Sequence, residues 1–430
     1  MTRKLEIVLV YALIILLPLH YILFSIILDD ISILKFWKEM VIFILLGLQV
    51  YSIYKKRDDK KINIKLNVTE IFIISFFIFE LVYIFIADKI YPAIYIARVY
   101  TEPLLVYFIF KNLKLSIEEY KKIYKLLLIE TSIICAYGIF QSLVLGDDFL
   151  LKLGYPTKRE GVLNSSFYLN GLGDFQRNVG TFVSSNTFAF FLGIISIVSI
   201  YAYEIFNRKK VYYIQLLIIF SGIVLTFSRS VWLGVAVAIL VMFIHSKNKK
   251  LFIKGISLLA FVALLGVIVI SLVTDINLIG NIIHLITRTL TFKDTSIISH
   301  FSSLNESINI FSENIMGTGL GMNGPKARQF YDNAYLTESS YFLLLFEFGI
   351  IGTIIYIGIL ISILVRAFLR KKEGLICNWC CNSIYSITAF ILVVFTFLPF
   401  VQDMEIITYY FLFAGLCENK VSEDYKKEIN

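Results

Sequence analysis

Repeated apolar runs, each long enough to cross a lipid bilayer as a helix, limit what this chain can fold into more than any other feature. A helical crossing takes about 20 residues. Hydrophobic residues make up 58% of the 430 residues and charged residues 17%, a balance too apolar for an ordinary soluble domain. The sequence therefore predicts an all-α polytopic membrane protein with about twelve transmembrane helices, near 6–28, 33–54, 68–88, 91–110, 124–145, 182–204, 211–227, 230–246, 251–274, 340–368, 383–401 and 404–417.

The distribution of lysine and arginine between these spans predicts the orientation of the chain. Because short basic loops stay in the cytoplasm, we expect both termini there. The net charge of +8 is explained by this asymmetry and by anionic membrane lipids, so no nucleic-acid partner is expected. The basic junctions alternate with junctions that carry few basic residues, and they lie at 55–61, 111–125, 208–210, 247–254 and 366–372.

Two of the loops expected on the outer side are long enough to carry chemistry, at 146–177 and 275–338. Within the second, apolar residues recur at three- and four-residue steps from Phe301 to Ile315, which predicts an amphipathic helix at the membrane boundary. Ser303 and Glu306 have the spacing of a capping box near its start. This helix is expected either to pack over the bundle or to take part in function.

Charged residues inside the spans are costly and therefore informative. Glu80 and Arg98 lie at equal distances from the outward turn at Lys89, so antiparallel neighbours would bring them to the same depth. Glu102 lies one turn beyond Arg98 on the same face. Two interpretations stay open: a buried structural ion pair, or a guanidinium at the floor of an outward cavity that binds an anion.

Two further arginines lie where spans meet the outer side. Arg229 stands between Ser228 and Ser230 in a tight turn, as either an interfacial arginine or a planar donor that fits phosphate oxygens. Arg177 precedes the span at 182–204, where a helix N-terminus offers free N–H groups to an anion or is simply capped.

The second outward loop also holds a glycine-rich stretch and two candidate bases. Gly317, Gly319 and Gly321 could present successive backbone N–H groups to an anion, although no Walker A motif follows them. His300 and Glu338 are candidates to deprotonate a hydroxyl, against the alternative of ordinary polar surface. The loop carboxylates are scattered, so no metal site is expected.

Taken in order, these fragments resemble the O-antigen ligase/polymerase superfamily of bacterial surface-polysaccharide assembly. The resemblance spans roughly residues 177–358, and the first third of the chain fits by hydropathy alone. It predicts a division into 1–178, with five spans and the first outward loop, and 179–430, the family-like region with the outward loop 275–338. The fragments are Arg177-Asn-Val-Gly-Thr-Phe182, Leu225-Thr-Phe-Ser-Arg-Ser-Val-Trp-Leu233, Ser299-His300, Glu313-Asn-Ile-Met-Gly-Thr-Gly-Leu-Gly321, Glu338-Ser-Ser-Tyr341 and Phe346-Glu-Phe-Gly-Ile-Ile-Gly352.

The resemblance implies an inverting, metal-free glycosyltransferase without a cofactor, in the bacterial plasma (inner) membrane. Its donor would be an oligosaccharide on undecaprenyl pyrophosphate at the outer face. The family's phosphate-binding arginine falls on Arg229, with Arg288 as a looser candidate for a second beside Arg177 and Arg98. Family ligases carry His-Asn where this chain has Glu338-Ser339, which favours the polymerase branch, with Ser339 and the glycines as substrate-binding candidates.

A polymerase of O-antigen, capsule or exopolysaccharide is therefore the expected function, with Glu338 or His300 as the base. A ligase that transfers the glycan to a different acceptor is the first alternative. A flippase or transporter of the lipid-linked oligosaccharide is the second, and it would favour internal repeats and midplane polar sites, which the sequence does not display. The chain-length regulator and the flippase of the same pathway are candidate protein partners.

Overall fold

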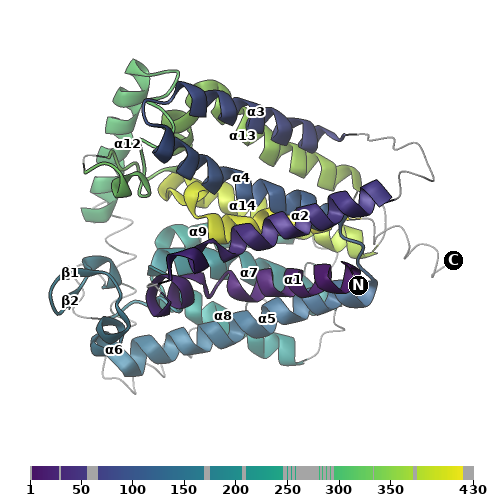
Figure 1. The fold of residues 1–430 in the computed structure, drawn as a ribbon. Coiled ribbons are helices and arrows are strands. Elements are labelled where there is room, and N and C mark those ends of the chain that lie inside the picture. The colour runs from purple at the N-terminus through teal and green to yellow at the C-terminus, as the bar shows by residue number, and fades with distance from the viewer. Residues whose placement is uncertain are drawn as a thin grey trace. The chain divides into compact units, whose positions relative to one another are not determined.

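The computed structural model describes residues 2–28, 31–55, 66–168, 175–205, 210–245, 295–332, 334–370 and 375–419, with isolated positions between 249 and 291. The regular secondary structure of these residues is helical apart from one small antiparallel sheet, which confirms the all-α membrane fold (Figure 1). Six of the described helices are long and apolar enough to cross a membrane, or seven if the helices Arg3–Leu16 and Tyr21–Ile27, bent by 73°, form one span.

The count of about twelve crossings stays a prediction. Lys210–Leu225 and Arg229–His245 are apolar but shorter helices, and the expected span at 251–274 falls outside the continuously described residues. The long helices expose large apolar side chains on their outer sides, such as Phe85 at 82% and Phe368 at 69%. Exposed apolar surface of this kind suits contact with lipid rather than water.

The chain contacts divide the protein into two compact units, each built from separate stretches of sequence. The first comprises residues 1–10, 38–117 and 299–430, and the second comprises residues 11–37 and 118–298. Helix α1 (Thr2–Leu16) contributes to both. The division at residue 178, which rests on the family resemblance, stays a prediction.

In the first unit, helix α4 packs against α15 and α3, and α13 packs against α3 and α14. Helix α3 begins at a capping box, in which Asn67 accepts from the Glu70 amide while the Glu70 side chain accepts from the Asn67 amide. The elements of this unit are α2 (Trp37–Lys55), α3 (Val68–Ile86), α4 (Ile90–Asn112), α12 (Thr295–Glu313), η5 (Ala327–Gln329), α13 (Ser340–Arg370), α14 (Leu375–Phe397), η6 (Phe400–Gln402) and α15 (Met404–Glu418).

Helix α13 is broken at Gly349, whose φ of 63° and ψ of −170° are not helical. A Cβ atom there would lie 2.5 Å from the carbonyl carbon of Met316, so glycine is needed for both the backbone angle and the close approach. The Ile350 amide, released by the break, donates to the Ile315 carbonyl at 3.1 Å. The break in α13 thus forms a hydrogen bond and a close backbone contact with Ile315 and Met316, in the segment that follows α12.

Helix α12 confirms the amphipathic helix expected at 301–315, but it begins earlier than predicted. Because it runs from Thr295 to Glu313, Ser303 and Glu306 lie within it, and the predicted capping box near the helix start is wrong. The Ser307 hydroxyl lies 3.3 Å from the Thr337 hydroxyl, so one face of α12 packs on the segment that leads into α13.

In the second unit, helices α7, α8 and α9 pack against one another. The segment after α5, which the sequence places on the outer side, includes a short helix and a two-stranded hairpin. The elements of this unit are η1 (Tyr21–Ile27), η2 (Ser32–Phe36), α5 (Ile117–Phe140), the π-helical η3 (Gln141–Leu145), α6 (Gly146–Leu153), β1 (Thr157–Arg159), β2 (Val162–Leu163), η4 (Ser165–Phe167), α7 (Ser185–Ile205), α8 (Lys210–Leu225) and α9 (Arg229–His245).

Candidate functional site

Arg177 is anchored in the second unit by three hydrogen bonds to uncharged acceptors among the described residues. Its Nε atom donates to the Thr226 carbonyl at 2.8 Å, one Nη to the Asn186 side-chain oxygen at 2.8 Å, and the other Nη to the Ser166 carbonyl at 3.2 Å. Among the described residues, no carboxylate forms an ion pair with this guanidinium. Its orientation is therefore fixed while its charge stays available to an anion.

The turn between α8 and α9, which Arg177 contacts at the Thr226 carbonyl, leads directly into Arg229. Phe227 in this turn has a φ of 52°, which a bulky residue seldom adopts, and such strain is typical of functional turns. The Asn178 amide donates to the Leu225 carbonyl at 3.0 Å, so the Arg177 loop and the turn are bonded through backbone and side chain alike. Arg229 then opens α9 as its first residue, at a helix N-terminus that favours anions.

The two arginines are close enough to affect each other. Burial lowers the pKa of Arg177, and the positive charge of Arg229 lowers it further, to about 10 from an ordinary 12.5. Two like charges held together in this way are stabilised when an anion lies between them. The structure thus brings together two of the predicted phosphate-binding residues, in an arrangement suited to a phosphate or pyrophosphate group.

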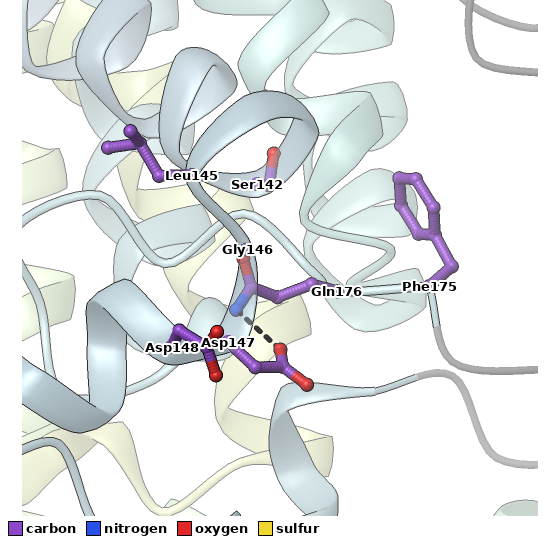
Figure 2. A pocket seen from close by; sticks show the side chains of 7 residues that line it. All are labelled: Ser142, Leu145, Gly146, Asp147, Asp148, Phe175 and Gln176. Atoms are coloured by element: carbon purple, nitrogen blue, oxygen red, sulfur yellow. Dashed lines mark hydrogen bonds between the residues drawn. The ribbon is translucent and has the colours of Figure 1, made fainter.

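A polar pocket of about 400 Å³ includes Phe175 and Gln176, which directly precede Arg177 in the chain, and Figure 2 shows the side chains that line it. The Gln176 side-chain nitrogen donates to the Asp147 carboxylate at 2.9 Å, and the Tyr168 hydroxyl donates to the same carboxylate. The sequence reasoning did not identify Asp147 or Gln176 as site residues. The pocket is lined by Ser142, Leu145, Gly146, Asp147, Asp148, Phe175 and Gln176.

Arg98, the third predicted phosphate-binding arginine, lies in the first unit and has carboxylate partners. It contacts Glu39 at 2.9 Å and Glu102 at 3.6 Å, whereas Glu80 accepts a hydrogen bond from Thr101. The expected pairing of Arg98 with Glu80 is therefore wrong. Equal depth allowed that pairing, but α2, whose contribution the spacing argument did not consider, supplies the nearer carboxylate.

The glycine-rich stretch lies in the first unit, where its amides donate to protein oxygens. All three of the predicted substrate-binding glycines have positive φ, at 85° for Gly317, 116° for Gly319 and 85° for Gly321. The Gly317 amide donates to Asn314 and the Gly319 amide to Phe346, both at backbone carbonyls. A direct ligand role for these glycines stays a prediction.

Glu347 of α13 is the carboxylate that organises this stretch, and the sequence reasoning missed its role. Its side chain is fully buried and accepts from the Gly321 amide at 2.5 Å and from the Asn323 amide at 3.3 Å. The available signal was an acidic residue about two turns inside an apolar span, a position that is costly unless the charge is bonded.

The predicted base and its neighbours also lie in the first unit. Glu338 is partly buried just before α13, and the adjacent Ser339 donates to the Phe395 carbonyl at 3.2 Å. His300 lies in α12, where its side chain is outside the described part of the structure, and Arg288 falls outside the described residues altogether. The roles of these four residues stay predictions.

A family model described as O-antigen ligase matches residues 214–357. This match supports membership of the chain in the O-antigen ligase/polymerase superfamily, and we call residues 214–357 the superfamily region. The superfamily region contains Arg229, Gly317, Gly319, Gly321 and Glu338, whereas Arg177 and Arg98 precede it. None of the curated proteins matches this chain.

The match also supports a function in general terms. It favours a multi-pass membrane enzyme of the O-antigen ligase or polymerase type, since members of this family are glycosyltransferase-like enzymes. The superfamily region begins inside α8 and ends inside α13, so it includes the α8–α9 turn with Arg229. The arginine pair therefore joins one residue of the superfamily region to one residue of the preceding loop.

Proposed function

We propose that this protein is a polysaccharide polymerase, which transfers a glycan from undecaprenyl pyrophosphate to a lipid-linked repeat unit at the outer face of the plasma membrane. The observation that carries the proposal is the arginine pair, in which Arg177 is oriented by uncharged acceptors and lies near Arg229. A lipid pyrophosphate is the leaving group whose developing negative charge such a pair would stabilise.

The transfer requires one bond to form and one to break. The acceptor hydroxyl oxygen attacks the anomeric carbon of the donor, its proton passes to a base, and the bond from that carbon to the pyrophosphate oxygen breaks. Attack opposite the leaving group inverts the anomeric centre. The energy is already stored in the donor, so neither a nucleotide nor a metal ion enters the proposed reaction.

The base in this proposal is Glu338, with His300 as the alternative. Glu338 is favoured because it lies partly buried just before α13, at the start of the predicted tenth span. The chain has Glu338-Ser339 where family ligases carry His-Asn, and this difference supports polymerisation over ligation to another acceptor.

The test is glycan length on the carrier lipid after purified protein is incubated with the lipid-linked repeat unit. We expect ladders of repeats with the unaltered protein and single repeats with Arg229→Ala or Arg177→Ala. Arg159→Ala is the matched control, because Arg159 lies exposed in the same outward loop and should leave the ladder unchanged. Normal ladders from both arginine variants would remove the pair from the mechanism.

Gene deletion separates the three function classes. Loss of a polymerase leaves single repeats exported, loss of a flippase leaves them on the cytoplasmic side, and loss of a ligase leaves long chains on the carrier lipid. Long chains retained on the carrier would replace the polymerase proposal with the ligase alternative.

A further inference from the structure

The polar pocket that includes Phe175 and Gln176 has the construction of a ligand site. One wall is the π-helical segment η3, which is followed by Gly146 at a φ of 67° and the start of α6. π-Helical turns are rare and frequently lie at functional sites. The volume of about 400 Å³ falls within the range of roughly 300–1,000 Å³ that small-molecule sites occupy.

The polar groups of this pocket are not fully satisfied by the protein. Gln176 is only 4% exposed, and its side-chain oxygen has no hydrogen-bond partner among the described residues. Next to the pocket, although not part of its lining, Gln141 is fully buried, and neither of its amide atoms has a hydrogen-bond partner in the described part of the chain. Buried polar atoms without partners are uncommon in folded proteins, and a hydroxyl-rich ligand is one group that supplies them.

The lining of the pocket adjoins the loop and the turn that carry the two arginines. Gln176 directly precedes Arg177, and Figure 2 shows its side chain extending to the Asp147 carboxylate. The Phe175 ring packs edge-to-face on the Phe227 ring at 5.5 Å, in the turn that leads to Arg229. Residues 175 and 176 thus connect the pocket to the loop and the turn that carry the arginines.

We propose that this pocket binds the sugar residue attached directly to the pyrophosphate of the donor, and that it selects a neutral, hydroxyl-bearing sugar. This inference rests on the function proposed above. Asp147 accepts from sugar hydroxyls, Gln176 both donates and accepts, and Phe175 supplies an apolar wall. With the exposed Asp148 beside it, Asp147 repels a uronic acid in the same position.

The test compares binding of defined probes to purified protein in nanodiscs. The probes are a short-chain polyprenyl diphosphate without sugar and the same lipid bearing glucose, galactose, N-acetylglucosamine or glucuronic acid. We expect at least one neutral sugar to tighten binding about tenfold over the sugar-free lipid, the effect of one charge-assisted hydrogen bond. Glucuronic acid should give no gain.

Variants separate this inference from the proposed function. Asp147→Asn and Gln176→Met should lose the sugar-dependent gain while retaining affinity for the sugar-free diphosphate, whereas Arg229→Ala should lose affinity for every probe. Glu160→Gln, at an exposed position of the hairpin turn, is the control and should behave as the unaltered protein. A sugar-dependent gain that persists in both pocket variants, or no gain from any neutral sugar, would overturn the subsite. Sugar-free diphosphate binding that is unaffected by Arg229→Ala would instead overturn the pyrophosphate role.

Discussion

The guanidinium of Arg177 donates through Nε to the carbonyl oxygen of Thr226 at 2.8 Å, which joins the loop before α7 to the turn before α9. This bond orients a cation beside Arg229 without using a carboxylate, so both the position and the charge are available for an anionic substrate. The arrangement is typical of preorganised electrostatic sites, in which the donors are fixed before the reaction begins.

Inorganic pyrophosphate should stabilise the folded protein through this pair. A ligand that binds only the folded state at 100 times its dissociation constant adds about 2.7 kcal/mol to the free energy of unfolding. We expect a rise in melting temperature with the unaltered protein and little or no rise with Arg177→Ala or Arg229→Ala. Arg159→Ala should respond fully, and an equal response from all four proteins would contradict the site.

Replacing Gly138 in α5 should disturb the loop that contains Arg177, because Gly138 packs against the backbone of that loop. An added Cβ would meet the Asn178 side-chain oxygen and lie 2.9 Å from the Gly180 Cα atom, so Gly138→Ala should cost about 1–3 kcal/mol of stability. Gly47→Ala in α2 is the matched control, because nothing lies within 4 Å of its added Cβ. There the helix propensity of alanine should raise the free energy of unfolding by about 0.5–1 kcal/mol. In thermal unfolding, Gly138→Ala should therefore melt at a lower temperature than the unaltered protein and Gly47→Ala at a higher one.

Glu347→Gln should loosen the glycine-rich stretch. An amide nitrogen cannot accept from a backbone N–H, so one of the bonds to Gly321 or Asn323 is lost, at a cost of about 1–3 kcal/mol. Protease cleavage within 317–324 should become faster. Glu313→Gln, at an exposed position that ends α12, should leave the cleavage rate unchanged, and equal rates in both variants would contradict the anchoring role.

Lys326 should make stability depend on pH at the alkaline end. Burial lowers the pKa of Lys326, but attraction to Glu405 and Asp403 outweighs it, so its folded-state pKa lies above the ordinary 10.5. The stabilisation is thus fully present below 10.5 and is lost as pH rises through the folded pKa. The difference in unfolding free energy between the unaltered protein and Lys326→Met should be constant from neutral to mildly alkaline pH and shrink above 10.5. Arg328→Met, which removes a neighbouring exposed cation, should show no such decline.

The sequence by itself determined the membrane fold, the amphipathic helix that the structure shows as α12, and the tight turn that leads into Arg229. These features follow from apolar run length and from three- to four-residue periodicity, which are properties of neighbouring residues along the chain.

Only the tertiary structure decided which groups are partners. It pairs Arg98 with Glu39 rather than Glu80, directs Glu347 to the glycine amides, and joins Arg177 to the turn before Arg229. Several carboxylates lie at depths that sequence spacing cannot distinguish, and the choice among them depends on how helices distant in sequence pack and rotate. The polar pocket likewise needs the π-helical end of α5 and residues 175–176 together, a combination that no local pattern encodes.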